Sequence, residues 1–278
     1  MTNSVHTNTS ALLALQSLNK TNERLTDVQS RVNTGLKVQG AKDNASVWAI
    51  AQGQRADVGA LAAVQMSLDR ATSIADVALA AGETISDLLN QLMEKVVAAN
   101  DESLDTQARA ALNSDYQAIL RSIEQAVDNA EFDGANILNG SLSSGIRFLA
   151  NADADAFVTL TAKDLTLGGD ILEMPATSSL DTLTAAAQAL DDLKLSIGQL
   201  NAALGELGSQ AKQIESHNGF VAKLMDTLES GIGNLVDADL AKESARLTAL
   251  QVQQQLGAQA LSIANQAPQI ILSLFRGG

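Results

Sequence analysis

The N-terminal part of the chain carries apolar residues at helical spacing. Within residues 5–36 one stripe alternates four and three residues apart, through Ala11, Leu15, Leu18, Asn22, Leu25, Gln29 and Val32. This spacing predicts one long helix with a coiled-coil seam. At about 1.5 Å per residue, such a helix would be roughly 48 Å long. We therefore expect it to need a partner helix.

The C-terminal part of the chain is the candidate partner. Within residues 236–275, Leu240, Leu247 and Leu261 occupy heptad-compatible positions, and Gln254 interrupts them. Polar residues at seam positions lower the stability of a coiled coil but fix its register. We predict that the two ends of the chain pair with each other.

The middle of the chain shows further helical patterns. Residues 34–44 contain two glycines and are interpreted as a connector. Helical periodicity then runs from about residue 56 to 100 and resumes from about 106 to 129, which predicts two antiparallel helices. It returns after Pro175 and continues to about residue 230.

Residues 132–170 have a different character, because glycines separate short apolar runs. The two clearest runs are Ile146–Leu149 and Phe157–Leu160, and residues 151–156 between them form a suitable loop. Asn139 followed by Gly140 is a strong signal for a tight turn. We expect small β-hairpins here.

These patterns predict a mainly α fold with long terminal helices pairing as a coiled coil, an antiparallel helical bundle and a small β-hairpin region. We expect five segments. They are residues 1–44 (inner coiled coil and connector), 45–131 (bundle), 132–177 (hairpins), 178–232 (bundle helix) and 233–278 (inner coiled coil).

Composition and charge narrow the functional classes. Only 3% of the 278 residues are aromatic, and cysteine is absent. The net charge is −14 with 18 Lys and Arg residues, so nucleic acid and anionic membranes are not expected as partners. No apolar run approaches the ~20 residues of a membrane span, and residues 1–10 do not match a cleavable secretory signal. If the protein leaves the cell, we expect another export route.

The chain carries no recognisable catalytic or metal-binding pattern. His6 and His217 are far apart in sequence and have no metal-ligand spacing around them. Asn151, Asp153 and Asp155 resemble the start of a calcium loop, but apolar residues follow where glycine and oxygen ligands are needed. No phosphate-binding or nucleophile motif occurs. We expect no enzyme activity, no cofactor and no metal site.

Both ends of the chain resemble bacterial flagellins. Residues 8–46 read NTSALLALQSLNKTNERLTDVQSRVNTGLKVQGAKDNAS, and residues 239–276 read DLAKESARLTALQVQQQLGAQALSIANQAPQIILSLFR. The segments EFDGANIL (131–138) and NADADAFVTL (151–160) are similar to the hairpin region of the family. The resemblance covers about residues 1–140 and 178–276. The chain looks like a compact flagellin that lacks variable outer domains.

The resemblance implies a structural subunit that polymerises with copies of itself into the extracellular flagellar filament for swimming motility. The terminal helices would form an inner layer around a central channel, and the bundle and hairpins would form the next shell. It also implies secretion through the flagellar type III export channel. The implied partners are an export chaperone, the filament cap and the hook-junction proteins.

Apolar residues of the terminal seams are the predicted polymerisation interface, because they would be largely disordered or exposed until copies meet. They are Leu12, Leu15, Leu18, Leu25, Val32, Leu240, Leu247, Leu250, Leu261, Leu272, Leu274 and Phe275.

A patch that an innate immune receptor recognises on many flagellins aligns with residues 89–97. Gln91 stands where recognised relatives have arginine, and Lys95 stands where they have leucine, next to Glu94. Asp115 keeps an acid on the adjacent helix. We expect weak or no receptor activation.

Some flagellins carry O-linked glycans on outward hydroxyls. The candidates here are Ser141, Ser143, Ser144, Thr177, Ser178 and Ser179, for which ordinary loop polarity is the alternative.

Two other functions stay open at this point. One is a hook-filament junction protein, and the other is a secreted coiled-coil adaptor or effector.

Overall fold

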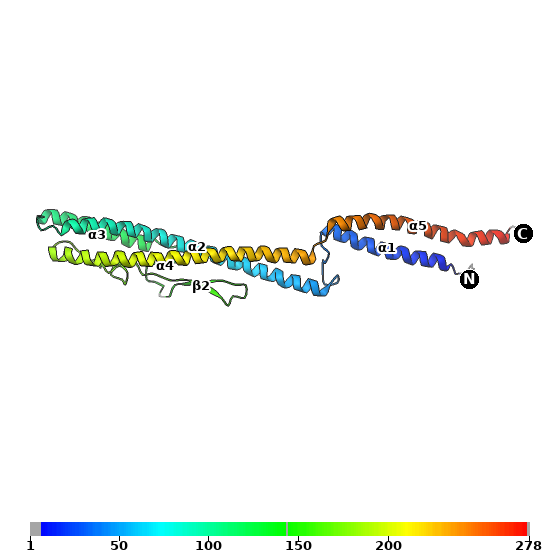
Figure 1. Ribbon diagram of the computed structural model, residues 1–278, viewed down its shortest axis with the longest axis horizontal. Coiled ribbons are helices and arrows are strands. Elements are labelled where there is room, and N and C mark those ends of the chain that lie inside the picture. Colours follow the sequence, from blue (N-terminus) through cyan, green and yellow to red (C-terminus); the bar gives the residue numbers. More distant parts are fainter. Residues whose placement is uncertain (1–6, 143, 277–278) are drawn as a thin grey trace. The chain divides into compact units, whose positions relative to one another are not determined.

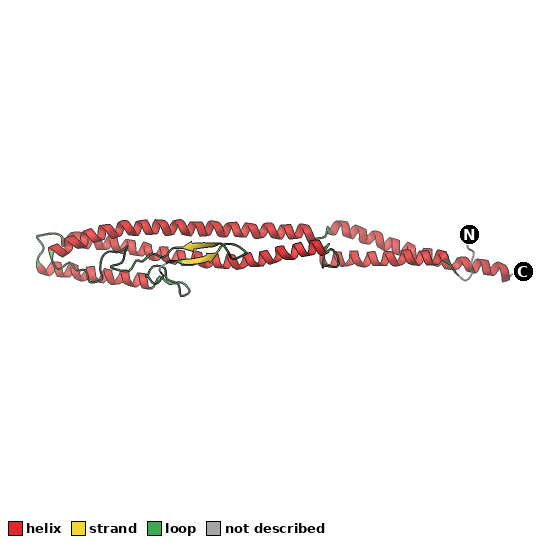
Figure 2. Cartoon of the chain, turned by 90° about the horizontal axis from the view of Figure 1, so that it is seen from below, coloured by secondary structure: helices red, strands yellow, loops and turns green. Residues whose placement is uncertain are grey.

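The computed structural model describes residues 7–142 and 144–276, and the side chains of residues 267–276 lie outside this description. The elements in chain order are α1 Thr9–Thr34, α2 Ala45–Ala99, α3 Thr106–Asp128, β1 Ile146–Leu149, β2 Phe157–Leu160, α4 Leu183–Val236 and α5 Leu240–Arg276. Figures 1 and 2 show these elements. The predicted mainly α fold with a small hairpin is confirmed.

The chain divides into two compact units. Residues 1–56 and 228–278 form the first, which we call the terminal unit, and residues 57–227 form the second, the middle unit. In the terminal unit, α1 and α5 lie side by side (Figures 1 and 2). The first and last parts of the chain therefore fold together.

Side-chain caps set where the helices begin. The Asn8 Oδ1 atom accepts the N–H of Ala11 at 3.0 Å, which satisfies one of the free donors at the start of α1. Equivalent side-chain bonds are made at the other helix starts by Asn44, Asp105, Thr182 and Asp239. Helix α1 ends at Gly35, whose φ of 72° suits glycine because it has no Cβ.

The caps explain where the predicted boundaries were wrong. Helix α2 begins at Ala45, about 11 residues before the predicted start, because Asn44 caps it and Gly53 is accommodated inside the helix. Helix α4 continues to Val236, and α5 starts at Leu240 rather than near 236. Helical periodicity located these helices but not their ends.

Two connectors of the terminal unit bind each other through backbone groups. The N–H groups of Lys37 and Val38 donate to the carbonyl oxygen of Val236 at 2.6 and 3.2 Å, and the N–H of Ala238 donates to the carbonyl of Gly35 at 2.8 Å. Val38 and Val236 are buried. The segments that leave α1 and enter α5 are therefore fixed to each other.

The middle unit is built on antiparallel packing of α2 against both α3 and α4. Asp69 accepts from Asn218 at 2.6 Å partway along α2 and α4, and Asn100, just after the end of α2, donates to the carbonyl of Ala186 near the start of α4 at 3.0 Å. The core consists of fully buried aliphatic side chains. Those on α2 and α3 include Leu68, Ile85, Leu89, Leu92, Leu120 and Ile123.

The only tyrosine of the chain helps to close this core. Tyr116 on α3 is fully buried, and its hydroxyl lies 3.0 Å from the Ser178 Oγ atom. Burial is the main cause that raises the pKa of the Tyr116 phenol. The segment before α4 is in this way attached to α3.

The two predicted strands form one antiparallel hairpin among the described residues, not several. Ile146 pairs with Leu160, and Leu149 pairs with Phe157. Gly145 precedes the first strand with a φ of 79°, and a Cβ there would collide with the carbonyl oxygen of Leu160. The strand bounds agree with the prediction because the apolar runs between glycines were short and unambiguous.

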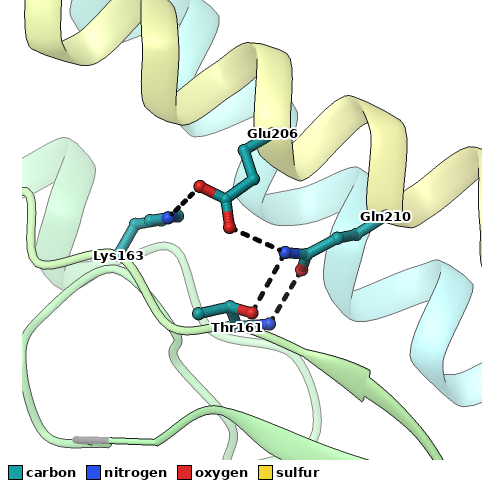
Figure 3. Close-up of polar contacts among 4 residues, drawn as sticks. All are labelled: Thr161, Lys163, Glu206 and Gln210. Carbon is teal, nitrogen blue, oxygen red and sulfur yellow. Dashed lines mark hydrogen bonds and ion pairs between the residues drawn. The ribbon is translucent and has the colours of Figure 1, made fainter.

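A polar cluster attaches the segment after β2 to α4 (Figure 3). Gln210 accepts the backbone N–H of Thr161 at 2.8 Å and donates to the Thr161 hydroxyl at 3.0 Å. Glu206 contacts Gln210 at 3.1 Å and the Lys163 ammonium at 2.5 Å. The half-exposed ion pair contributes little by itself. The paired bonds of Gln210 are the stronger attachment because they satisfy a backbone donor.

Candidate assembly interface

Helices α1 and α5 pack as an antiparallel pair along most of α1. Gly257 lies against Leu18 at the middle of the pair, and the Asn22 Oδ1 atom accepts from Gln254 Nε2 at 2.7 Å. Nearer the end of α1, Arg31 lies 4.0 Å from Glu243. The predicted pairing of the two chain ends is confirmed.

The face that α1 turns toward α5 differs from the predicted stripe at two positions. The inward positions include Ala14 and Val28, whereas Leu15 and Gln29, which were expected at the seam, are exposed. The predicted phase was wrong there because both four-then-three and three-then-four spacings fit this sequence. A small residue at position 14 lets the helices approach closely.

The pair buries part of the predicted interface within the subunit itself. Leu25 is only 9% exposed, contrary to the expectation that it stays free until assembly. The half-buried positions on the same side of the pair are Leu18, Val32, Leu247, Leu250 and Leu261. These residues already have apolar neighbours inside one subunit, so they stabilise the pair.

Other predicted interface residues face outward. Leu12 is 59% exposed, Leu15 is 42% exposed and Leu240 is 50% exposed. Exposed leucines on a paired helix are costly in water, since burying one is worth about 1.5–3 kcal/mol. Leu272, Leu274 and Phe275 belong to the interface prediction, but their side chains lie outside the described residues.

Four exposed apolar residues were missed by the sequence analysis. They are Leu13, Val252, Leu256 and Ile263. The sequence of α1 does indicate exposed leucines. Leu12, Leu13 and Leu15 stand within four residues, and successive positions of a helix are rotated by about 100° around its axis. They cannot all face one seam, so an outward apolar face was predictable. We call the residues Leu12, Leu13 and Leu15 the outer leucine patch.

The hydrogen bond between Asn22 and Gln254 leads to a stability prediction. Replacing Asn22 alone by Leu is expected to lower the unfolding free energy of the helix pair by about 1 kcal/mol, because the Gln254 amide loses its acceptor. The double variant N22L/Q254L should recover that loss and exceed the original stability. Thermal melting by circular dichroism checks this. Equal melting of the single and double variants would contradict it.

The predicted receptor patch lies on the α2–α3 face of the middle unit. Gln91 and Glu94 are exposed, while Leu89 and Leu92 beside them are fully buried. The Lys95 ammonium lies 3.6 Å from the Asp115 carboxylate, so the structure pairs these two predicted residues with each other.

The candidate modified hydroxyls differ in exposure. Ser141, Ser144 and Thr177 are exposed, whereas Ser178 and Ser179 are half-buried. The Ser178 hydroxyl is already bonded to Tyr116. Ser143 lies outside the described residues.

None of the described helices is apolar enough over a sufficient length to cross a bilayer. Within the same residues no three His, Cys, Asp or Glu side chains cluster as metal ligands.

The fold and the exposed helix pair define a mainly helical protein whose two ends fold together. The family model for the bacterial flagellin N-terminal helical region matches residues 5–143, and the model for the C-terminal helical region matches residues 188–275. The chain belongs to the bacterial flagellin family. It is therefore a structural subunit of the flagellar filament, the extracellular structure that serves motility.

Relatives of similar length agree with this family. The chain is 52% identical to Flagellin FljJ of Caulobacter vibrioides and 40% identical to a flagellin of Brucella melitensis, with 99% of each chain covered in both comparisons. It is 33% identical to Flagellin C of Rhizobium meliloti, where the alignment covers 98% of this chain and 99% of the relative.

Proposed function

We propose that copies of this chain join through the outward apolar face of the α1–α5 pair. The observation that carries this proposal is the outer leucine patch, since three leucines on one short stretch of a paired helix remain in water in a single subunit. Leu240, Val252, Leu256 and Ile263 are also exposed on α5. A surface that meets a different surface on the next copy generates an open helical polymer.

In this proposal the inner coiled-coil domain consists of residues 1–44 and 233–278. Residues 45–131 and 178–232 form the helical bundle domain together with the hairpin region 132–177. Val32, Leu247, Leu250 and Leu261 hold the helix pair together, and the exposed leucines contact neighbouring copies. Leu272, Leu274 and Phe275 would extend this contact.

The remaining partners follow from the same surface. Before export, apolar side chains of α5 suit binding by a chaperone, and the chain would pass unfolded through the flagellar export channel. At its destination it would meet the filament cap and the hook-junction proteins. The chain would act without catalysis, because its role is to pack against copies of itself.

Electron microscopy of the purified chain tests the proposed assembly. We expect long filaments, and sedimentation should show a critical concentration above which they form. A hook-filament junction protein would give only short or ring-like assemblies, and a coiled-coil adaptor would stay a single subunit. Either result would contradict the proposal.

We also expect weak or no activation of the innate immune receptor. The reasons are the exposed Gln91 in place of arginine and the engagement of Lys95 by Asp115. A reporter-cell assay with purified monomer checks this, and strong signalling would refute it.

We expect any O-linked glycans to be attached to the exposed hydroxyls of Ser141, Ser144 and Thr177. An intact mass equal to the 28.9 kDa of the unmodified chain would show that no glycan is attached.

A further inference from the structure

A polar groove follows one flank of the α1–α5 pair. It has a volume of about 540 Å³. Its lining positions on α1 recur at i, i+3, i+4 and i+7, which places them on one side of the helix. The charged lining residues are Arg24, Asp27, Arg31 and Arg246, and Val28 and Leu250 contribute apolar surface.

The groove continues along the same flank. A second hollow of about 420 Å³ shares Arg24 with the first and adds Lys20 and the exposed Leu256. Arg24 therefore stands at the junction of the two hollows. We call the combined surface the arginine groove.

The charges of the groove are incompletely compensated. The buried Glu243 carboxylate accepts from Arg246 at 2.7 Å and lies 4.0 Å from Arg31, so it serves two of the three arginines. Among the described residues, neither Arg24 nor Lys20 has an ion pair or hydrogen bond from its side chain. Asp27 is the acidic residue that lines the groove itself. An additional anionic group would compensate the charges of Arg24 and Lys20.

The distribution of charge along the chain indicates where such a group is available. The terminal unit holds nine of the 18 basic residues and seven of the 32 acidic residues, which gives a net charge of +2. The middle unit holds the other nine basic and 25 acidic residues, which gives −16. Copies of this chain therefore offer many carboxylates and few competing cations. Opposite charge of this kind favours association and fixes its register.

We propose that the arginine groove binds an acidic side chain of a second copy of this chain, with the Arg24 guanidinium as its principal partner. The proposal rests on the proposed filament assembly and adds a polar, register-setting contact to the apolar one. Arginine suits this role because its planar donors can hold a carboxylate through two hydrogen bonds. Glu243 positions Arg31 and Arg246 at the other end of the groove.

Zero-length crosslinking tests the proposal directly. In the variant R24K, a carbodiimide can join the new primary amine to a carboxylate that touches it. Filaments grown from equal amounts of ¹⁴N-labelled and ¹⁵N-labelled R24K chains should yield mixed-isotope crosslinks from position 24, which mass spectrometry can assign to an Asp or Glu. Crosslinks only within one chain, for example to Asp27, would overturn the proposal.

A second measurement follows polymerisation of R24Q at several salt concentrations. We expect its critical concentration to rise about tenfold at low salt, in keeping with loss of one charged hydrogen bond, and the difference from the original chain to shrink at high salt. The matched control is K42Q, which removes an exposed charge of the same unit outside the groove. Circular dichroism should show both variants folded.

The outcomes separate the two proposals. If the original chain forms no filaments, the proposed assembly fails. If the original chain polymerises and R24Q matches it at every salt concentration, only the arginine groove proposal fails. If phosphate raises the melting temperature of the original monomer but not of R24Q, while both polymerise equally, the groove is a site for free anions and the proposal is wrong.

Discussion

A variant in which Leu12 and Leu15 are both replaced by glutamine is expected to fold normally and to lose filament formation. Both side chains are exposed in the single subunit, so removing them costs the helix pair little. Glutamine has a helix propensity close to that of leucine, so α1 should persist. The variant loses the gain from burying the exposed parts of two leucines between copies. Because each is about half exposed in the single subunit, this gain is about 1.5–3 kcal/mol in total.

That loss corresponds to a rise of about 10- to 100-fold in the critical concentration, since 1.4 kcal/mol is tenfold. Sedimentation and electron microscopy measure it, and circular dichroism reports the fold. The matched control is L195Q, because Leu195 on α4 is also exposed, at 48%, but lies in the middle unit. The proposed interface is wrong if L12Q/L15Q polymerises like the original chain, or if L195Q is equally defective.

The second large effect is expected from Leu92→Ala in the core of the middle unit. Leu92 on α2 is fully buried, and truncating it removes apolar contact and leaves a cavity. We expect the unfolding free energy of this unit to fall by about 2–5 kcal/mol. Urea unfolding followed by circular dichroism measures this change.

The control for this substitution lies on the same helix. Val97 is 55% exposed, and Val97→Ala should change the unfolding free energy by no more than about 0.5 kcal/mol. If both variants unfold alike, the packing described for the middle unit is incorrect. L92A and L12Q/L15Q should thus show opposite patterns, one in stability and the other in assembly.

The sequence predicted elements better than it predicted which residues face inward. The hairpin strands were located correctly because glycines and loop residues delimit two short apolar runs. The predicted connector of residues 34–44 ends where α2 begins, but the start of the helix was missed because helical periodicity was recognised only from about residue 56. The helix starts at Ala45 because the Asn44 side chain caps it by accepting a hydrogen bond from the Val47 N–H.

The pairing of the two terminal helices was predictable, but the residues that face each other were not. The sequence analysis proposed Leu12 and Leu15 as assembly residues, and it placed Leu15 in the same stripe as Leu25, which is buried within the subunit. The spacing of apolar residues fits both a four-then-three and a three-then-four pattern, so it does not determine which set of residues faces the partner helix. The arginine groove could not be foreseen either, because it requires Arg24 and Arg246, more than 200 residues apart in sequence, to lie on the same flank.

The placement of the two strongest chromophores gives each unit its own optical reporter. Trp48, the only tryptophan, stands at the start of α2 in the terminal unit, and Tyr116, the only tyrosine, is buried in the middle unit. Tryptophan fluorescence and the ultraviolet absorbance of the phenol can therefore follow the two units separately without any label. Because burial raises the pKa of Tyr116, the phenol should ionise at a higher pH in the folded middle unit than in the unfolded chain, and alkaline titration of its absorbance would show the difference.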